Sequence, residues 1–173
     1  MNQPKNVLVD SASVLTLSTA EVASTDPEEY SRNGRSGYAD AVAWLAVEAA
    51  RRALTDVPAV LAASEETAVL ALSDHCTLTT MQNIARRMHA GKLSPMHFAG
   101  ANPGLLAGAV CMRWHMRGPS LTLTMPPRIG SETARLVASG WLHKGQARFV
   151  LLITHELHGV EHFATCTVFG RKQ

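Results

Sequence analysis

The stretch that decides the fold is GPSLTLTMPPRIGSETARLVASGWLHKGQARFVLLITHE, residues 118–156. It opens with Gly118 and Pro119, which end the preceding helical pattern, and a β-type run follows at residues 120–125. Residues 131–143 place apolar side chains at helical spacing, and Gly145 follows as a cap. Residues 149–153 are wholly apolar, as expected of a buried strand. The order strand, helix, strand predicts two parallel strands joined by a crossover helix.

Two more helices are predicted just upstream of this stretch. Asn102 and Pro103 are typical of a helix start, and the helix would run to the Gly118–Pro119 pair. Gly104 and Gly108 would leave room on it for a second backbone. Residues 73–80 lead into the other helix, whose inner stripe would be Leu78, Met81, Ala85 and Met88.

The rest of the chain extends the same alternation. Residues 6–17 predict a first strand, residues 18–37 a polar surface loop, and residues 38–54 an alanine-rich helix with Ala43, Val47 and Ala50 on one face. Residues 67–72 predict a compact strand, and residues 162–169 a last, antiparallel strand after a tight turn near Gly159. The sequence therefore predicts an α/β fold of layered order βαβαα-βαββ, with a mainly parallel five-stranded sheet.

Composition narrows the class of protein. The 173 residues are 46% apolar and 17% charged, which suits one domain covering residues 1–173 with a substantial core. A net charge of +2 falls far short of what nucleic acid binding demands. No leader pattern and no membrane-length apolar run is evident, and Cys76, Cys111 and Cys166 form no C-x-x-C pair. We expect a cytoplasmic protein with reduced cysteines, no membrane span and no cofactor.

Residues 118–156 resemble the nucleophile region of the β-ketoacyl synthases of the thiolase superfamily. In that family a Gly-Pro-Ser start, a strand, a cysteine turn, a helix ending in glycine and a strand ending in Gly-Gly-x-Glu follow one another. The residues that match in order and spacing are Gly118, Pro119, Ser120, Gly145, Ala147 and Glu156. The preceding SPMHFAGANPGLLAGAVCMRWHMRGPS and the strand at residues 6–17 are also similar. The resemblance implies a thiolase-like N-terminal half.

The same resemblance implies that the chain is not an enzyme. Counting from Gly118, the family's catalytic cysteine falls on Pro127, and proline supplies neither a thiol nor a backbone N–H. The family's catalytic histidines and oxyanion loop belong to a C-terminal half with no counterpart here. Proline is nevertheless tolerated in the first turn of a helix, so the corner should still fold.

Cysteine-less partner subunits of this family, the chain-length factors, stabilise an active ketosynthase and shape its acyl tunnel. The resemblance therefore implies a heterodimer with a full-length β-ketoacyl synthase in type II fatty acid or polyketide biosynthesis, similar to the half-length homologues of aryl-polyene-type clusters. The resemblance also suggests an acyl carrier protein as a further partner, and leaves open whether it touches this subunit. The implied tunnel and interface residues are His97, Ala101, Asn102, Leu105, Ser120, Leu121, Thr122, Leu123, Thr124 and Met125.

Three other readings of the residues stay open. A free-standing thioester hydrolase or acyltransferase could use Ser131 or Cys76 as its nucleophile, although neither lies in a G-x-S-x-G motif and Ser131 could be a helix cap. The run HELHGVEH, residues 155–162, could bind zinc, but histidines three apart on a strand point to opposite faces, and no metal is expected. Scattered arginines could receive a carrier protein or be an ordinary solvated face: Arg113, Arg117, Arg128, Arg135 and Arg148.

Overall fold

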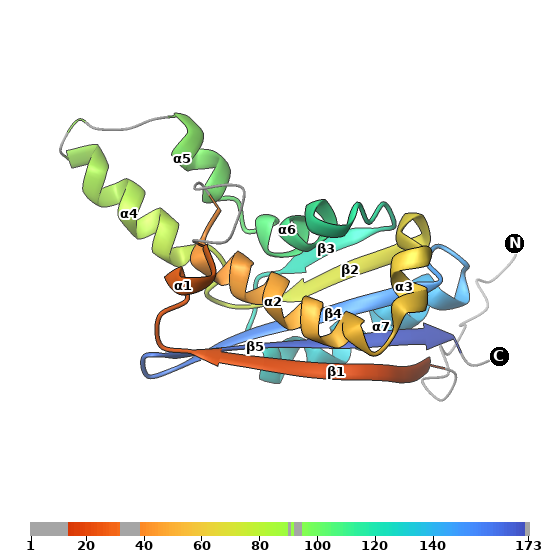
Figure 1. The fold of residues 1–173 in the computed structure, drawn as a ribbon. Helices are drawn as coiled ribbons and strands as arrows, with labels where there is room; N and C mark the ends of the chain where they lie inside the picture. Colours follow the sequence, from red (N-terminus) through yellow and green to blue (C-terminus); the bar gives the residue numbers. More distant parts are fainter. Residues whose placement is uncertain (1–13, 32–38, 90, 92–94, 172–173) are drawn as a thin grey trace, which may run out of the picture.

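A five-stranded sheet organises the molecule (Figure 1). The structure, a computed structural model, describes residues 14–31, 39–89, 91 and 95–171. The sheet order is β1-β5-β4-β2-β3, and the strands are β1 (Val14–Ser24), β2 (Thr67–Leu72), β3 (Ser120–Leu123), β4 (Phe149–His158) and β5 (Glu161–Arg171). β5 alone runs against the common direction, pairing antiparallel with both β1 and β4, whereas β2 is parallel to β3 and β4. The predicted mainly parallel sheet with an antiparallel last strand is confirmed.

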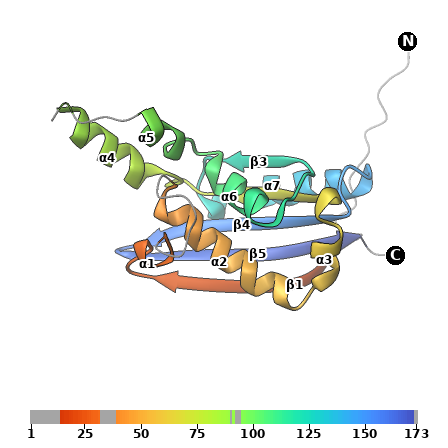
Figure 2. The same ribbon diagram turned by 45° about the horizontal axis from the view of Figure 1, so that its top comes forward.

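Helices cover the two faces of the sheet unequally. α2 (Ala41–Thr55) and α6 (Leu105–Trp114) pack on one face over the larger of two apolar clusters. α7 (Pro127–His143) covers the other face, where Ala134, Ala138 and Leu142 meet β2 and β4 (Figures 1 and 2). The three-layer arrangement follows from strands that are apolar on both sides, since all six residues of β2 are buried.

The strand–helix–strand core at residues 118–156 forms as predicted. β3 and β4 both lie parallel to β2, and α7 connects them. Gly118 is required at its start because a Cβ there would lie 2.6 Å from the carbonyl carbon and oxygen of Thr67. α7 begins at Pro127, four residues earlier than predicted, and ends before Gly145, whose φ of +66° provides the expected left-handed cap.

The N-terminal part of the sheet differs from the prediction. The structure places β1 at Val14–Ser24, whereas a strand was expected at residues 6–17, of which residues 6–13 lie outside the described part. Residues 18–24 were predicted as a surface loop, which is wrong: they pair with β5 along residues 162–168. Their serines and threonines suit a strand with one exposed face, so polarity alone was misleading. Residues 28–31 form a short helix, α1 (Glu28–Ser31).

The alanine-rich helix is confirmed as α2. Asp40 caps it by accepting a hydrogen bond from the Val42 N–H at 3.0 Å, and nine of its residues are buried. Ala43 and Ala50 are fully buried, as the predicted face requires. Two short elements that the sequence did not suggest follow it, α3 (Pro58–Ala62) and a 3₁₀ turn at residues 64–66.

The segment between β2 and α6 is where packing departs most from expectation. α4 (Leu78–His89) and the short α5 (Pro95–Gly100) project away from the sheet (Figures 1 and 2); we call them the arm. The stripe predicted to face inward is exposed, and Ile84 is the one buried residue of α4. α6 begins at Leu105 rather than at Pro103 and ends at Trp114, where His115 adopts φ +55°. A Cβ on Gly108 would meet no atom within 4 Å, so the expected close backbone approach is absent there.

The C-terminal hairpin is longer than predicted. β4 extends to His158 and β5 from Glu161 to Arg171, joined by the predicted tight turn with Gly159 at φ +67°. β4 thereby runs past the end of β2, because Leu72 pairs with Thr154. This overhang carries His155, Glu156 and His158 to the edge of the sheet where the parallel strands end.

Candidate functional site

The carboxyl ends of the parallel strands meet at one corner, where open α/β sheets usually bind their ligands. β3 ends at Leu123, and after two residues Pro126 caps α7 and Pro127 begins it. The N–H groups of Ile129 and Gly130 both donate to the Pro126 carbonyl, which closes the first turn. A cleft of about 160 Å³ opens beside this turn and is lined by Asp74, His75, Pro126, Pro127, Arg128, Glu156, Leu157 and His158.

Proline at the first position of α7 decides what this corner can do chemically. Pro127 is buried and has no N–H, so it offers neither a nucleophile nor a hydrogen bond to a developing oxyanion. Its ring suits a first helical turn, whose N–H groups have no intrahelical partner. Gly130, one turn on, lets α7 approach the sheet, since a Cβ there would lie 2.6 Å from Leu72 Cδ1. The corner is tightly built and lacks a nucleophile at its helix start.

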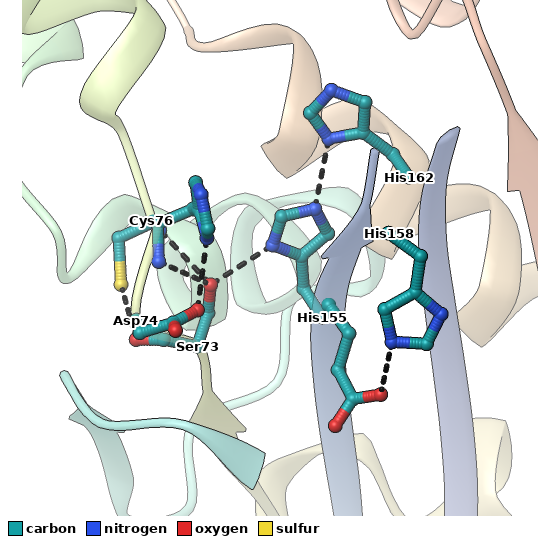
Figure 3. A network of polar contacts seen from close by, with 8 residues as sticks. Ser73, Asp74, Cys76, His155, His158 and His162 are labelled. Atoms are coloured by element: carbon teal, nitrogen blue, oxygen red, sulfur yellow. Dashed lines mark hydrogen bonds and ion pairs between the residues drawn. The ribbon is translucent and has the colours of Figure 1, made fainter. Parts of the chain in front are cut away.

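On the face of the overhang opposite the cleft, three polar side chains are hydrogen-bonded in a row, and we call them the Ser73–His155–His162 chain (Figure 3). Ser73 Oγ lies 2.9 Å from His155 Nδ1, and His155 Nε2 lies 3.0 Å from His162 Nδ1. The two imidazole rings stack with centroids 5.2 Å apart. Figure 3 shows His155 between Ser73 and His162, with His158 directed away from them. Ser73 and His155 are fully buried.

The hydrogen bonds around Ser73 determine which atoms of the Ser73–His155–His162 chain carry protons. Ser73 Oγ already accepts the N–H groups of His75 and Cys76, at 3.1 and 2.9 Å, so its own proton is donated to His155 Nδ1. His155 must then carry its proton on Nε2 and donate it to His162 Nδ1. Both rings are thus neutral. Burial, helped by the neighbouring His162 and His75, lowers the pKa of His155 to about 3, and burial also lowers the pKa of His162.

Neither of the two alternative nucleophiles is activated. Cys76 is buried, burial raises its pKa, and its Sγ donates to the Ser73 carbonyl at 3.1 Å. Ser131 donates its Oγ proton to the Pro127 carbonyl at 2.6 Å, inside the second turn of α7. Ser131 is therefore not a helix cap, because α7 begins four residues before it.

The HELHGVEH run is divided between the two faces of the sheet, as its spacing predicts. His155 points into the core, whereas His158 is exposed and lies 3.2 Å from the Glu156 carboxylate. Across the described ranges, no group of three or more His, Cys, Asp or Glu side chains is arranged to hold a metal ion. Glu156 lines the cleft beside Pro127.

The residues predicted for a partner's acyl tunnel fall in two places. Ala101, Asn102 and Leu105 lie at the junction of α5 and α6, where the Ala101 carbonyl accepts the Thr77 hydroxyl at 2.7 Å and Asn102 Oδ1 accepts the Gly104 N–H. His97 is in α5, but its side chain lies outside the described part. The others belong to the edge strand β3 and the residues after it: Ser120, Leu121, Thr122, Leu123, Thr124 and Met125. Leu121 is exposed, and Met125 packs against the α7 cluster.

The Ser73–His155–His162 chain was missed at the sequence level. Its only signal was positional: residues 155 and 162 lie on either side of a tight turn at Gly159, so a hairpin brings them to neighbouring positions. A second hollow, of about 480 Å³, lies between α7 and the start of β1 and was also unforeseen. It is lined by Val14, Thr16, Glu132, Arg135, Leu136, Ala138, Ser139 and Phe169.

Comparison with solved structures identifies the fold. A chain of the ishigamide ketosynthase/chain length factor superimposes with a TM-score of 0.76 at 12% identity, over 92% of this chain and 62% of that one. A chain of the ketosynthase ApeO in complex with its chain length factor ApeC, from Xenorhabdus doucetiae, gives 0.64 at 13% identity, over 92% and 79%. A chain of the AntDE:AntF complex, a type II polyketide synthase acyl-carrier protein with its ketosynthase, gives 0.68 at 10% identity, over 93% and 63%.

These likenesses show a thiolase-like fold of the kind found in ketosynthases and chain length factors. The chain spans about three fifths of the length of the first and third of these structures. By sequence alone, no family model and no curated protein matches the chain. Along the described ranges, no helix is long and apolar enough to cross a membrane.

Proposed function

We propose that the protein is a non-catalytic, chain-length-factor-like partner that binds and stabilises an active β-ketoacyl synthase and shapes its acyl tunnel. The observation that carries this proposal is Pro127 as the first residue of α7, at the corner where the resemblance to ketosynthases places the catalytic cysteine. The carbon–carbon bond would form on the partner, whose cysteine and histidines perform the chemistry.

The histidines of this chain support the same proposal. The rings of His155 and His162 are occupied with each other and with Ser73, and burial keeps both neutral. A general base must have a reacting group within hydrogen-bond reach, and His155 has both ring nitrogens engaged inside the core. These residues hold the end of the hairpin against the turn after β2.

The contact with the partner is proposed to form along β3 and the α5–α6 junction. β3 is an edge strand, and an edge strand presents main-chain N–H and C=O groups that a strand of another protein can pair with. Antiparallel pairing through β3 would join two sheets into one. The residues after β3 and around Ala101 and Leu105 would then lie next to the partner's tunnel, where the small side chain of Ala101 leaves room for an acyl chain.

The pathway follows from the resemblance. We place the protein in type II fatty acid or polyketide biosynthesis, of the aryl-polyene type, with acyl chains delivered on a carrier protein. ApeO and ApeC form a ketosynthase and chain length factor complex, which makes an arrangement of this kind structurally reasonable.

Co-expression with a ketosynthase encoded beside the gene, followed by gel filtration, tests the proposal. We expect one complex containing both proteins, and a ketosynthase that is more stable in the complex than alone. Leu121→Lys on β3 should weaken the complex, whereas the equivalent change at Val160, which is exposed in the β4–β5 turn and not on the β3 edge, should not. Two independently eluting proteins would contradict the proposal.

A further inference from the structure

Acidic residues are absent from one continuous third of the chain. From His75 to Ser131 there is no Asp or Glu, although the chain has 14 of them. Six of the 16 Lys and Arg fall in the same segment, so the rest of the chain carries ten basic and 14 acidic residues. A net charge of +2 conceals this division, because a cationic segment is offset by an acidic remainder.

The acid-free segment lies together in space as well as in sequence. It comprises the arm, α6, β3 and the start of α7. In Figures 1 and 2, the arm, α6 and β3 lie on the same side of the molecule, around the edge of the sheet that β3 forms. β1 forms the opposite edge, and its long pairing with β5 places the acidic Glu21 there.

The same segment holds most of the exposed apolar side chains. Of the twelve large hydrophobic residues exposed among the described residues, eight fall within it, among them Met81, Met88, Phe98, Met112 and Leu121. Met81 is 51% and Met112 63% exposed. Exposed apolar side chains on neighbouring elements, accompanied by cations, indicate an interaction surface, since scattered single residues would need no explanation.

The charges at this surface discriminate between partners. Arg86 lies on α4, hydrogen-bonded to Asn83, and Arg113 lies on α6 with its guanidinium 5.6 Å from the Trp114 ring centroid. Pairing two copies of the chain through this face would bring like charges together in a contact that excludes water, where repulsion is strongest. A partner with carboxylates around its apolar contact would instead be attracted and steered into place.

We infer that this face, formed by the arm, α6 and β3, is a docking surface for a protein with an acidic face, and that its excess of positive charge selects such a partner over a second copy of the chain. The inference rests on the proposed function for the identity of the partner, but the charge selection is a property of this chain alone. An anionic membrane would also attract cations, but it could not pair with the main-chain groups of an edge strand.

A charge-reversed copy of the chain is the probe for this surface. In the variant Arg86→Glu/Arg87→Glu/Arg113→Glu the face is acidic while its shape is retained. We expect neither the wild type nor the variant to self-associate at low salt, and their equimolar mixture to form a dimer measured by sedimentation. Raising the salt from about 50 mM to about 500 mM should dissociate that dimer, because screening shortens the reach of the charges.

A matched control reverses three exposed cations outside the segment, in Lys144→Glu/Arg148→Glu/Arg171→Glu. This control should not associate with the wild type. If the first variant fails to fold, the neutral Arg86→Gln/Arg87→Gln/Arg113→Gln should self-associate about tenfold more tightly than the wild type, because the repulsion is removed.

Three outcomes would overturn the inference: a wild-type dimer through this face at low salt, a mixture that associates no better than the control, or wild-type binding to phosphatidylserine vesicles without any binding to the reversed copy. Failure of the proposed function looks different, since the mixture would associate although no ketosynthase binds. Conversely, a ketosynthase complex insensitive to salt and to the reversal would retain the proposed function and overturn the charge selection.

Discussion

α2 and α4 show the same kind of apolar pattern in sequence but have opposite fates in the structure. α2 buries nine of its fifteen residues against the sheet and α6. α4 buries Ile84 alone, while Leu78, Met81 and Met88 are 42%, 51% and 58% exposed. Packing against other parts of the same chain explains the apolar pattern of α2. The apolar stripe of α4 is not covered by any part of the chain that the structure describes, and it fits the docking surface inferred above.

The largest effect on stability is expected in α2, which packs in the core, in contrast to α4. Leu45→Ala in α2 removes a fully buried side chain from the main cluster and should lower the free energy of unfolding by about 2–5 kcal/mol. Urea denaturation followed by circular dichroism measures it. A loss below about 1 kcal/mol would mean that α2 is not the packed centre described here.

The second effect is a pH dependence located at the hairpin end. His155 is neutral in the folded protein, with a pKa of about 3 against 6.5 in the unfolded chain, so the unfolded state binds more protons as the pH falls below 6.5. Stability is therefore full above that pH and declines below it. Between pH 7 and pH 5 we expect His155 to account for a loss of about 2 kcal/mol in the free energy of unfolding.

Two variants separate this histidine from others. His155→Gln should flatten the decline between pH 7 and pH 5, whereas His158→Gln, at an exposed ring, should leave it unchanged. A wild type equally stable at both pH values would show that the Ser73–His155–His162 chain tolerates a proton.

A smaller effect is expected at the start of α7. Pro127→Ala should destabilise the protein by about 0.4–1 kcal/mol, because proline in a compatible first turn restricts the unfolded chain. Thermal unfolding of Pro127→Ala, compared with that of the wild type and of Pro126→Ala, would measure this loss of stability. Increased stability would indicate that the proline is strained rather than suited to its place.

The smallest effect is expected on the arm. Met81→Ser/Met88→Ser should change the free energy of unfolding by no more than about 0.5 kcal/mol, since both side chains are already half exposed. The same change should weaken binding to a ketosynthase. A large loss of stability in the isolated chain would instead place the α4 stripe in the core, as its periodicity predicted.

Local signals predicted the elements that are held within the chain. The glycines at 118 and 145 and the apolar runs of β2 and β4 have causes within a few residues, and each is found. β1 was misplaced because its polar residues face outward on a strand whose partner, β5, lies more than a hundred residues away. Periodicity also cannot say whether a stripe is buried by the same chain or by another, and so the exposed arm was not foreseen.

Only one part of the candidate site, the corner at Pro127, could be predicted from the sequence. Pro127 was located by counting from Gly118 along the pattern of the family that the sequence resembles, although the helix was predicted to begin only at residue 131. The Ser73–His155–His162 chain joins three strand ends and needs the register of β4 with both β2 and β5. No short sequence motif indicates such a register.

In the proposed function, this protein contributes surface to a partner and no bond-making chemistry. This proposal is tested most directly by measuring carbon–carbon bond formation from acyl and malonyl thioesters while a purified ketosynthase is titrated with the chain. The account predicts no product from the chain alone, and ketosynthase activity or product length that changes until the two proteins are equimolar. Product formed by the chain without a ketosynthase would contradict it.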